Sequence, residues 1–126
     1  MADEPKVSFD NKREMDAAAF SEAAYVLDQA RQNLADSEGC EKALTYNQLL
    51  WSIIQADVSE DNNDLPEELK ANLMSLSIFV DRQTIKALAD TKGDYLDTLI
   101  NINKNLAEGL MAQPDDPLVD PPVSSP

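Results

Sequence analysis

The chain contains no histidine and only one cysteine, Cys40. Without imidazole, the Ser-His-Asp and Cys-His arrangements of nucleophilic catalysis cannot form, and a common nitrogen ligand of zinc is missing. The single thiol lies between Glu38 and Glu41, and neighbouring carboxylates raise a thiol pKa rather than activate it. We therefore expect no enzymatic activity and no cofactor. Cys40 is interpreted as a small core residue of a protein in a reducing compartment.

Positive charge is also scarce, since ten Lys and Arg residues stand against 24 Asp and Glu residues. The formal net charge of −14 repels phosphate groups, which disfavours direct binding to nucleic acid or to an anionic membrane surface. No uninterrupted apolar run approaches the ~20 residues of a membrane-spanning helix. The first residues contain no basic segment and no apolar segment, so we expect no signal peptide. Together these features predict a soluble, cytoplasmic protein.

Apolar residues recur at helical spacing along most of the chain, but not in residues 1–10, which we expect to be flexible. The spacing predicts a first helix from Asn11, with Asp10 or Asn11 as its cap. Gly39 has the backbone freedom to end this helix in a left-handed conformation. The helix carries an alanine-rich apolar stripe, made of Met15, Ala19, Ala23, Val26, Leu27, Ala30 and Leu34.

Three further helices are predicted over residues 40–58, 66–90 and 95–111. The second is apolar around most of its circumference, with Trp51 as a core anchor, and we place it at the centre of the domain. Asn103 lies within the apolar face of the fourth helix, where a buried amide can fix the register between helices. Asn47 is interpreted in the same way, or as a cap for a neighbouring helix end.

Residues 113–126 are acidic and proline-rich, and they contain too few apolar side chains to fold. We expect them to form a disordered tail. Residues 11–112 are then a single domain, and the sequence contains no convincing strand. The predicted fold is all-α, a compact bundle of about four helices.

The third predicted helix carries apolar side chains on two opposite faces. One face is formed by Leu69, Leu73, Leu76, Val80 and Ala87, and it must meet the second helix. The other contains Met74, Ile78 and Ile85. Either the first or fourth helix covers this second face, or it is an open groove for a partner helix. We expect Ile78 to be covered, with Met74 and Ile85 nearer the rim, and Arg82 either to pair with a carboxylate or to reach the partner.

One connection has a spacing that is typical of calcium ligands. The residues at positions 1, 3, 5, 7 and 12 of an EF-hand-like loop are Asp57, Ser59, Asp61, Asn63 and Glu68. However, Asn62 occupies the position at which that loop needs glycine, and Pro66 falls within it. A solvated acidic connection between two helices explains the same residues, so we expect no metal site.

Several short motifs occur together in a distinctive order. They are L-W at 50–51, L-P at 65–66, S-L-x-x-F-V-x-R at 75–82 and I-N-x-N-x-x-x-G-L at 102–110. In this order and spacing they resemble the FlaF family, the small flagellar biosynthesis proteins of alphaproteobacteria. The resemblance is dense from Glu41 to Leu110, continues more weakly through the first helix, and excludes both tails.

The resemblance implies a non-enzymatic cytoplasmic factor that binds flagellin as an export chaperone and acts with a second regulator, FlbT, in setting flagellin synthesis. A helical bundle with a spare apolar face is compatible with this role, because flagellin termini are amphipathic helices that aggregate before assembly. The alternative is a regulatory adaptor that binds FlbT or the export apparatus without holding flagellin. The acidity of the chain disfavours direct contact with flagellin mRNA.

Overall fold

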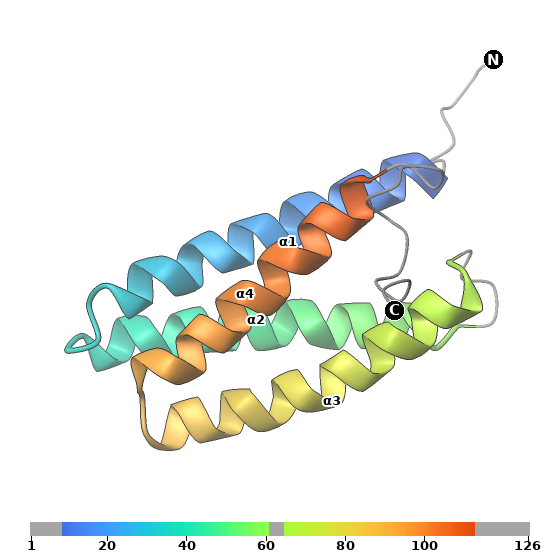
Figure 1. Ribbon diagram of the computed structural model, residues 1–126. Helices are drawn as coiled ribbons and strands as arrows, with labels where there is room; N and C mark the ends of the chain where they lie inside the picture. Colours follow the sequence, from blue (N-terminus) through green and yellow to red (C-terminus); the bar gives the residue numbers. More distant parts are fainter. Residues whose placement is uncertain (1–8, 61–64, 113–126) are drawn as a thin grey trace, which may run out of the picture.

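The computed structural model describes residues 9–60 and 65–112, with side chains from Arg13 onwards. These residues form four α-helices and no strand: α1 (Phe9–Arg31), α2 (Ser37–Val58), α3 (Glu67–Ala89) and α4 (Gly93–Met111). The helices pack as a bundle (Figure 1). The predicted all-α fold and the number of helices are therefore confirmed. The expected flexible start and the acidic tail at 113–126 fall largely outside the described residues, although α1 already begins at Phe9.

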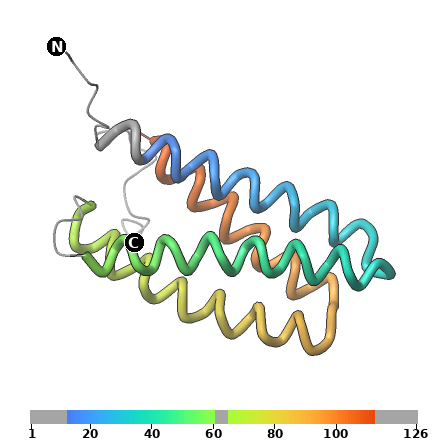
Figure 2. The backbone as a smooth tube through the Cα atoms, turned by 180° about the vertical axis from the view of Figure 1, so that it is seen from behind, coloured from blue at the N-terminus to red at the C-terminus, as the bar shows by residue number. Residues whose placement is uncertain are grey.

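The helices are arranged as two pairs, α1 with α4 and α2 with α3. The contact between α1 and α4 is the most extensive in the bundle, although these are the first and last helices in sequence. Figure 2, seen from behind, shows the two pairs diverging toward the end at which α1 begins and α4 ends. The contact between α3 and α4 is the least extensive of those between neighbouring helices. As a result, α3 is held mainly by α2.

The core is centred on Phe20 of α1 and Trp51 of α2, whose ring centroids lie 5.1 Å apart in a tilted arrangement. Around these rings pack further buried side chains from all four helices, including Leu27, Leu44, Val80, Leu96 and Leu99. The predicted stripe on α1 is partly correct. Its alanines at 23 and 30 and Leu27 are buried, but Met15 and Leu34 are exposed. Leu34 is exposed because it lies beyond the end of α1. The predicted stripe also missed Phe20, whose ring packs on Trp51 of α2.

The turn between α1 and α2 corrects a second expectation. The carboxylate of Asp36 accepts a hydrogen bond from the backbone N–H of Gly39 at 3.0 Å and caps the start of α2. Gly39 therefore lies in the first turn of α2 and does not end α1 in a left-handed conformation. A Cβ atom at position 39 would meet the Asp36 carboxylate, so the glycine makes room for the cap.

The expectation that α2 is surrounded by other elements is wrong. It packs on α1 and α3, and buries one stripe that contains Leu44, Trp51 and Ile54. The other side remains exposed, with Leu49 and Ile53 each more than half accessible to solvent. Within residues 9–60 and 65–112, no helix combines the length and apolar content that a membrane crossing requires.

Candidate partner-binding surface

Helix α3 buries polar side chains. Of its six buried residues, three are polar: Ser77, Gln83 and Thr84. The Ser77 hydroxyl donates to the Met74 carbonyl at 2.8 Å, and the Thr84 hydroxyl donates to the Val80 carbonyl at 2.7 Å. Because these hydroxyls bond within their own helix, they can be buried without an unpaired donor.

Large apolar side chains instead lie on the solvent side of α3. Ile78, Phe79, Ile85 and Leu88 are 49%, 43%, 63% and 43% exposed, respectively. We call these residues, with Arg82 and Lys86 between and beside them, the outer face of α3. Single exposed apolar residues are normal on a protein surface, but a group on one helix marks an interaction site. The outer face is therefore the first candidate for partner binding.

The four residues expected to bind a partner are distributed unequally over α3. Met74 is partly buried against the core, and its sulfur lies 3.8 Å from the Ser77 hydroxyl. Ile85 is open, as expected, but Ile78 is also about half exposed, so the expectation that another helix covers it is wrong. The reason is that α3 has only α2 and, slightly, α4 as neighbours, and neither covers this flank. Arg82 is exposed and forms no ion pair among the described residues.

A second apolar surface begins at the groove between α1 and α2 and continues along the exposed side of α2. Val26 and Tyr46 line an open pocket of about 470 Å³ at one end of this groove. Leu49 and Ile53, which are 59% and 56% exposed, extend along α2 beside Tyr46. We call this the α1/α2 surface. The sequence contains its signal, because Leu49 and Ile53 lie opposite the stripe of Trp51, but the interpretation of α2 as a central helix concealed it.

The central polar residues of the bundle serve its structure. The Trp51 indole N–H donates to the side-chain carbonyl of Asn103 at 3.0 Å, and the Asn103 amide donates to the side-chain carbonyl of Asn47 at 2.7 Å. All three residues are buried. The side-chain amide nitrogen of Asn47 has no hydrogen-bond partner among the described residues. Trp51 is a core anchor and Asn103 a buried hydrogen-bonding group, as the sequence predicts.

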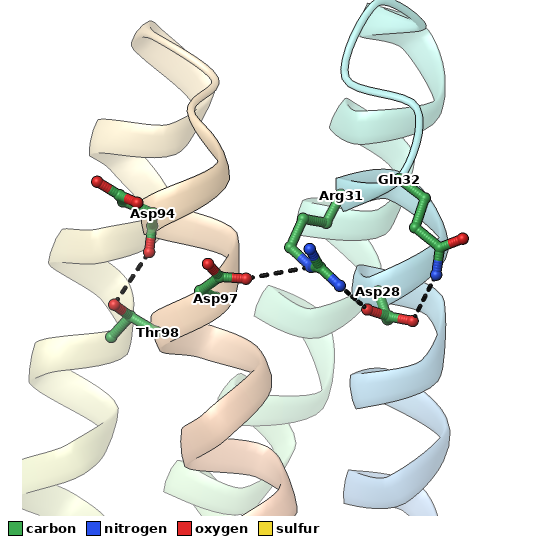
Figure 3. Close-up of polar contacts among 6 residues, drawn as sticks. All are labelled: Asp28, Arg31, Gln32, Asp94, Asp97 and Thr98. Atoms are coloured by element: carbon green, nitrogen blue, oxygen red, sulfur yellow. Dashed lines mark hydrogen bonds and ion pairs between the residues drawn. The ribbon is translucent and has the colours of Figure 1, made fainter.

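A polar link also joins α1 to α4 at the surface (Figure 3). Arg31 lies 2.7 Å from Asp28 on its own helix and 3.1 Å from Asp97 on α4. The hydrogen bond from Arg31 lowers the pKa of Asp28, and the bond to Asp28 raises the pKa of Arg31. Because the link is solvated, it orients the helices without contributing much to their stability.

Cys40 has the environment of a structural residue. Its side chain is buried, and its thiol lies 3.6 Å from the Ala30 carbonyl, to which it donates a weak hydrogen bond. Burial raises the pKa of the Cys40 thiol, and the nearby charge of Asp36 raises it further. A thiol held in its protonated form is a poor nucleophile. The interpretation of Cys40 as a small core residue is confirmed.

A model of the family described as "Flagellar protein FlaF" matches residues 2–110. The chain belongs to the FlaF family. The family match extends over all four helices to Leu110, and it therefore includes both the outer face of α3 and the α1/α2 surface. No curated protein and no solved structure matches the chain. FlaF membership assigns the protein to a flagellar accessory family and to no known class of enzyme.

Part of the calcium-like loop, residues 57–68, lies where the structure gives no description. Asp61 and Asn63 fall within residues 61–64, which are outside the described residues. In the part of the chain that is described, no group of three or more His, Cys, Asp or Glu side chains is placed to hold a metal ion. The expectation that this loop binds no calcium stays a prediction, which a binding experiment must test.

Proposed function

We propose that this protein binds flagellin as a cytoplasmic export chaperone and regulates flagellin synthesis and secretion together with FlbT, without enzymatic activity. The observation that supports this function is the outer face of α3, where large apolar residues are exposed while Ser77, Gln83 and Thr84 are buried. An amphipathic helix binds such a face by laying its own apolar stripe on it. Flagellin termini, which the family resemblance suggests as cargo, are helices of this kind.

The size of the outer face is suited to reversible binding. Fully burying one large aliphatic or aromatic side chain contributes about 1.5–3 kcal/mol, so four half-exposed ones contribute about 3–6 kcal/mol in total. Micromolar binding requires about 8 kcal/mol, after the cost of association. The apolar contacts of this face are therefore too weak for permanent binding without added polar contacts. A chaperone that must release its cargo for export needs such moderate affinity.

Co-purification from flagellate cells tests this proposal, with aspartate substitutions on the two apolar surfaces as matched variants. Ile85→Asp and Ile78→Asp place a charge on the outer face of α3, and Ile53→Asp places one on the α1/α2 surface at similar exposure. All three proteins should keep the wild-type melting temperature, because each altered side chain is exposed. We expect the two α3 variants to lose flagellin and Ile53→Asp to retain it.

The opposite pattern, with flagellin lost only in Ile53→Asp, would move the binding site to the α1/α2 surface. Retention by all three variants would exclude both surfaces. A wild-type protein that recovers no flagellin would contradict the chaperone function itself. Met74→Asp is less informative, because Met74 packs partly against the core and its substitution destabilises the fold.

The alternative function is a regulatory adaptor that binds FlbT or the export apparatus and does not hold flagellin. The α1/α2 surface supports this alternative, because it is a second exposed apolar region, separate from the outer face of α3. Recovery of FlbT but not flagellin with the tagged protein would support the adaptor. Loss of FlbT specifically in Ile53→Asp would assign it to the α1/α2 surface.

A further inference from the structure

Arg82 and Lys86 are the two cations of the outer face of α3. Both are exposed, and neither side chain forms a hydrogen bond or an ion pair with any other described residue. Most other described cations are engaged: these are Arg13, Arg31, Lys42, Lys70 and Lys92. Lys104, the remaining one, lies close enough to help lower the pKa of Asp28. Of the three described cations whose side chains form no ion pair, two therefore lie side by side on this face.

The spacing of these two cations opposes helix stability. Arg82 and Lys86 are four positions apart, so their side chains are neighbours on the helix surface, and like charges at this spacing repel. In a chain with 24 carboxylates and ten cations, α3 provides neither of the two with a carboxylate partner. The repulsion between these two cations is relieved when a partner supplies negative charge.

Arg82 is surrounded by the apolar residues that a partner would cover. Ile78 precedes it by four positions, Phe79 precedes it by three and Ile85 follows it by three, so all three are its neighbours on the helix surface. A partner that covers Ile78 and Ile85 also removes water from the Arg82 guanidinium. Removing an unpaired charge from water is costly, whereas a carboxylate at the same place offsets that cost with paired hydrogen bonds.

We propose that the outer face of α3 binds an amphipathic helix whose apolar stripe is bordered by acidic side chains, which pair with Arg82 and Lys86. The inference rests on the proposed function for the location of the site, and it adds the chemistry of the occupant. Ile78 and Ile85 are seven positions apart, or about 10 Å along the helix, so the occupant presents apolar residues over at least two turns.

The proposed occupant is acidic, whereas the negative net charge of the chain favours a basic partner. A net charge of −14 attracts cationic partners at long range, but physiological salt screens exposed charges beyond about 8 Å. Arg82 and Lys86 act within contact distance of the bound helix, where screening is weak. The local patch and the net charge therefore predict opposite preferences, and an experiment can distinguish them.

Two synthetic amphipathic peptides provide the probe. They share one apolar stripe and differ only in its borders, which are glutamate in one peptide and lysine in the other, and fluorescence anisotropy measures their binding to the full-length protein. We expect the glutamate peptide to bind the wild type about tenfold more tightly, because two charge-assisted contacts favour it. The double variant Arg82→Glu/Lys86→Glu should reverse this preference. The control Lys42→Glu/Lys104→Glu makes the same change in net charge elsewhere and should keep it.

Tighter binding of the lysine peptide by the wild type would overturn the inference, as would equal binding, no binding of either peptide, or a reversal in the control variant. Flagellin itself separates this failure from that of the proposed function. If the wild type binds flagellin and Arg82→Glu/Lys86→Glu binds it with unchanged affinity, the acidic-helix inference is wrong and the chaperone function stands. If the peptide preference is confirmed and flagellin does not bind, the chaperone function is wrong, but the preference of the outer face of α3 for an acidic amphipathic helix is supported.

Discussion

Trp51 of α2 and Asn103 of α4 are 52 positions apart in sequence, and a hydrogen bond of 3.0 Å joins the indole N–H to the amide oxygen in the core. Asn103 continues the chain of hydrogen bonds to Asn47, one turn before Trp51 on α2. A fully apolar contact would tolerate sliding of α2 along α4, whereas these donors and acceptors meet in one register only. The two buried asparagines thus give the bundle a specific alignment.

Trp51→Ala should unfold the protein or nearly so. The side chain is fully buried against Phe20, and truncation of a buried aromatic residue costs about 3–5 kcal/mol. This is a large share of the roughly 5–15 kcal/mol that stabilises an ordinary domain. Urea unfolding followed by circular dichroism measures the effect, with the exposed Tyr25→Ala as control. An unchanged unfolding curve together with lost partner binding would show instead that Trp51 contacts a partner.

Asn103→Leu should destabilise the protein although it makes the core more apolar. The substitution leaves the Trp51 N–H and the Asn47 carbonyl without partners, and each orphaned buried group costs about 1–3 kcal/mol. Asn105→Leu on the exposed side of α4 is the matched control, for which we expect a change within about 0.5 kcal/mol. Equal stability of the two variants in urea would mean that the hydrogen-bonded chain is unimportant.

Asp28→Asn should reduce stability at neutral pH but not in acid. The hydrogen bond from Arg31 lowers the pKa of Asp28 below its ordinary value of 3.8, so the folded state favours the ionised carboxylate. That contribution is fully present above pH 3.8 and disappears as the pH falls through the lowered pKa. Urea unfolding at pH 7 and in strong acid measures it. In an Arg31→Gln background the same Asp28→Asn substitution should cost less stability at pH 7, because only Gln32 and Lys104 then favour the carboxylate. An undiminished loss would show that Arg31 is not the main cause of the pKa shift.

Calcium should leave the stability of the protein unchanged. The loop that begins at Asp57 lacks the glycine that an EF-hand loop needs, and Pro66 falls within it. Thermal unfolding curves recorded with calcium and with chelator should superimpose. A ligand that binds only the folded state must raise the melting temperature, so an increase of several degrees with millimolar calcium would demonstrate a site.

Helical periodicity predicted the four helices and the burial of Asn103, because both depend on neighbouring positions in sequence. It did not predict which apolar faces obtain a neighbour. Leu49 and Ile78 were assigned to covered surfaces, but α2 and α3 each have an open flank that depends on how the helix pairs diverge. Gly39 shows a second limit: the glycine fits a helix end and a helix start equally well, and the side chain of Asp36 determines which one forms.

The guanidinium of Arg13 donates a hydrogen bond of 2.6 Å to the Ala112 carbonyl, across 99 positions of sequence. This bond belongs to the α1/α4 contact, so the first helix has its main partner in the last. During synthesis, α1 leaves the ribosome long before α4, so its most extensive contact cannot form in the interval. Contacts between distant segments form slowly, because a long stretch of chain must be ordered before they are made. The nascent chain therefore stays incompletely folded until its fourth helix is made, and folding is completed only near the end of translation.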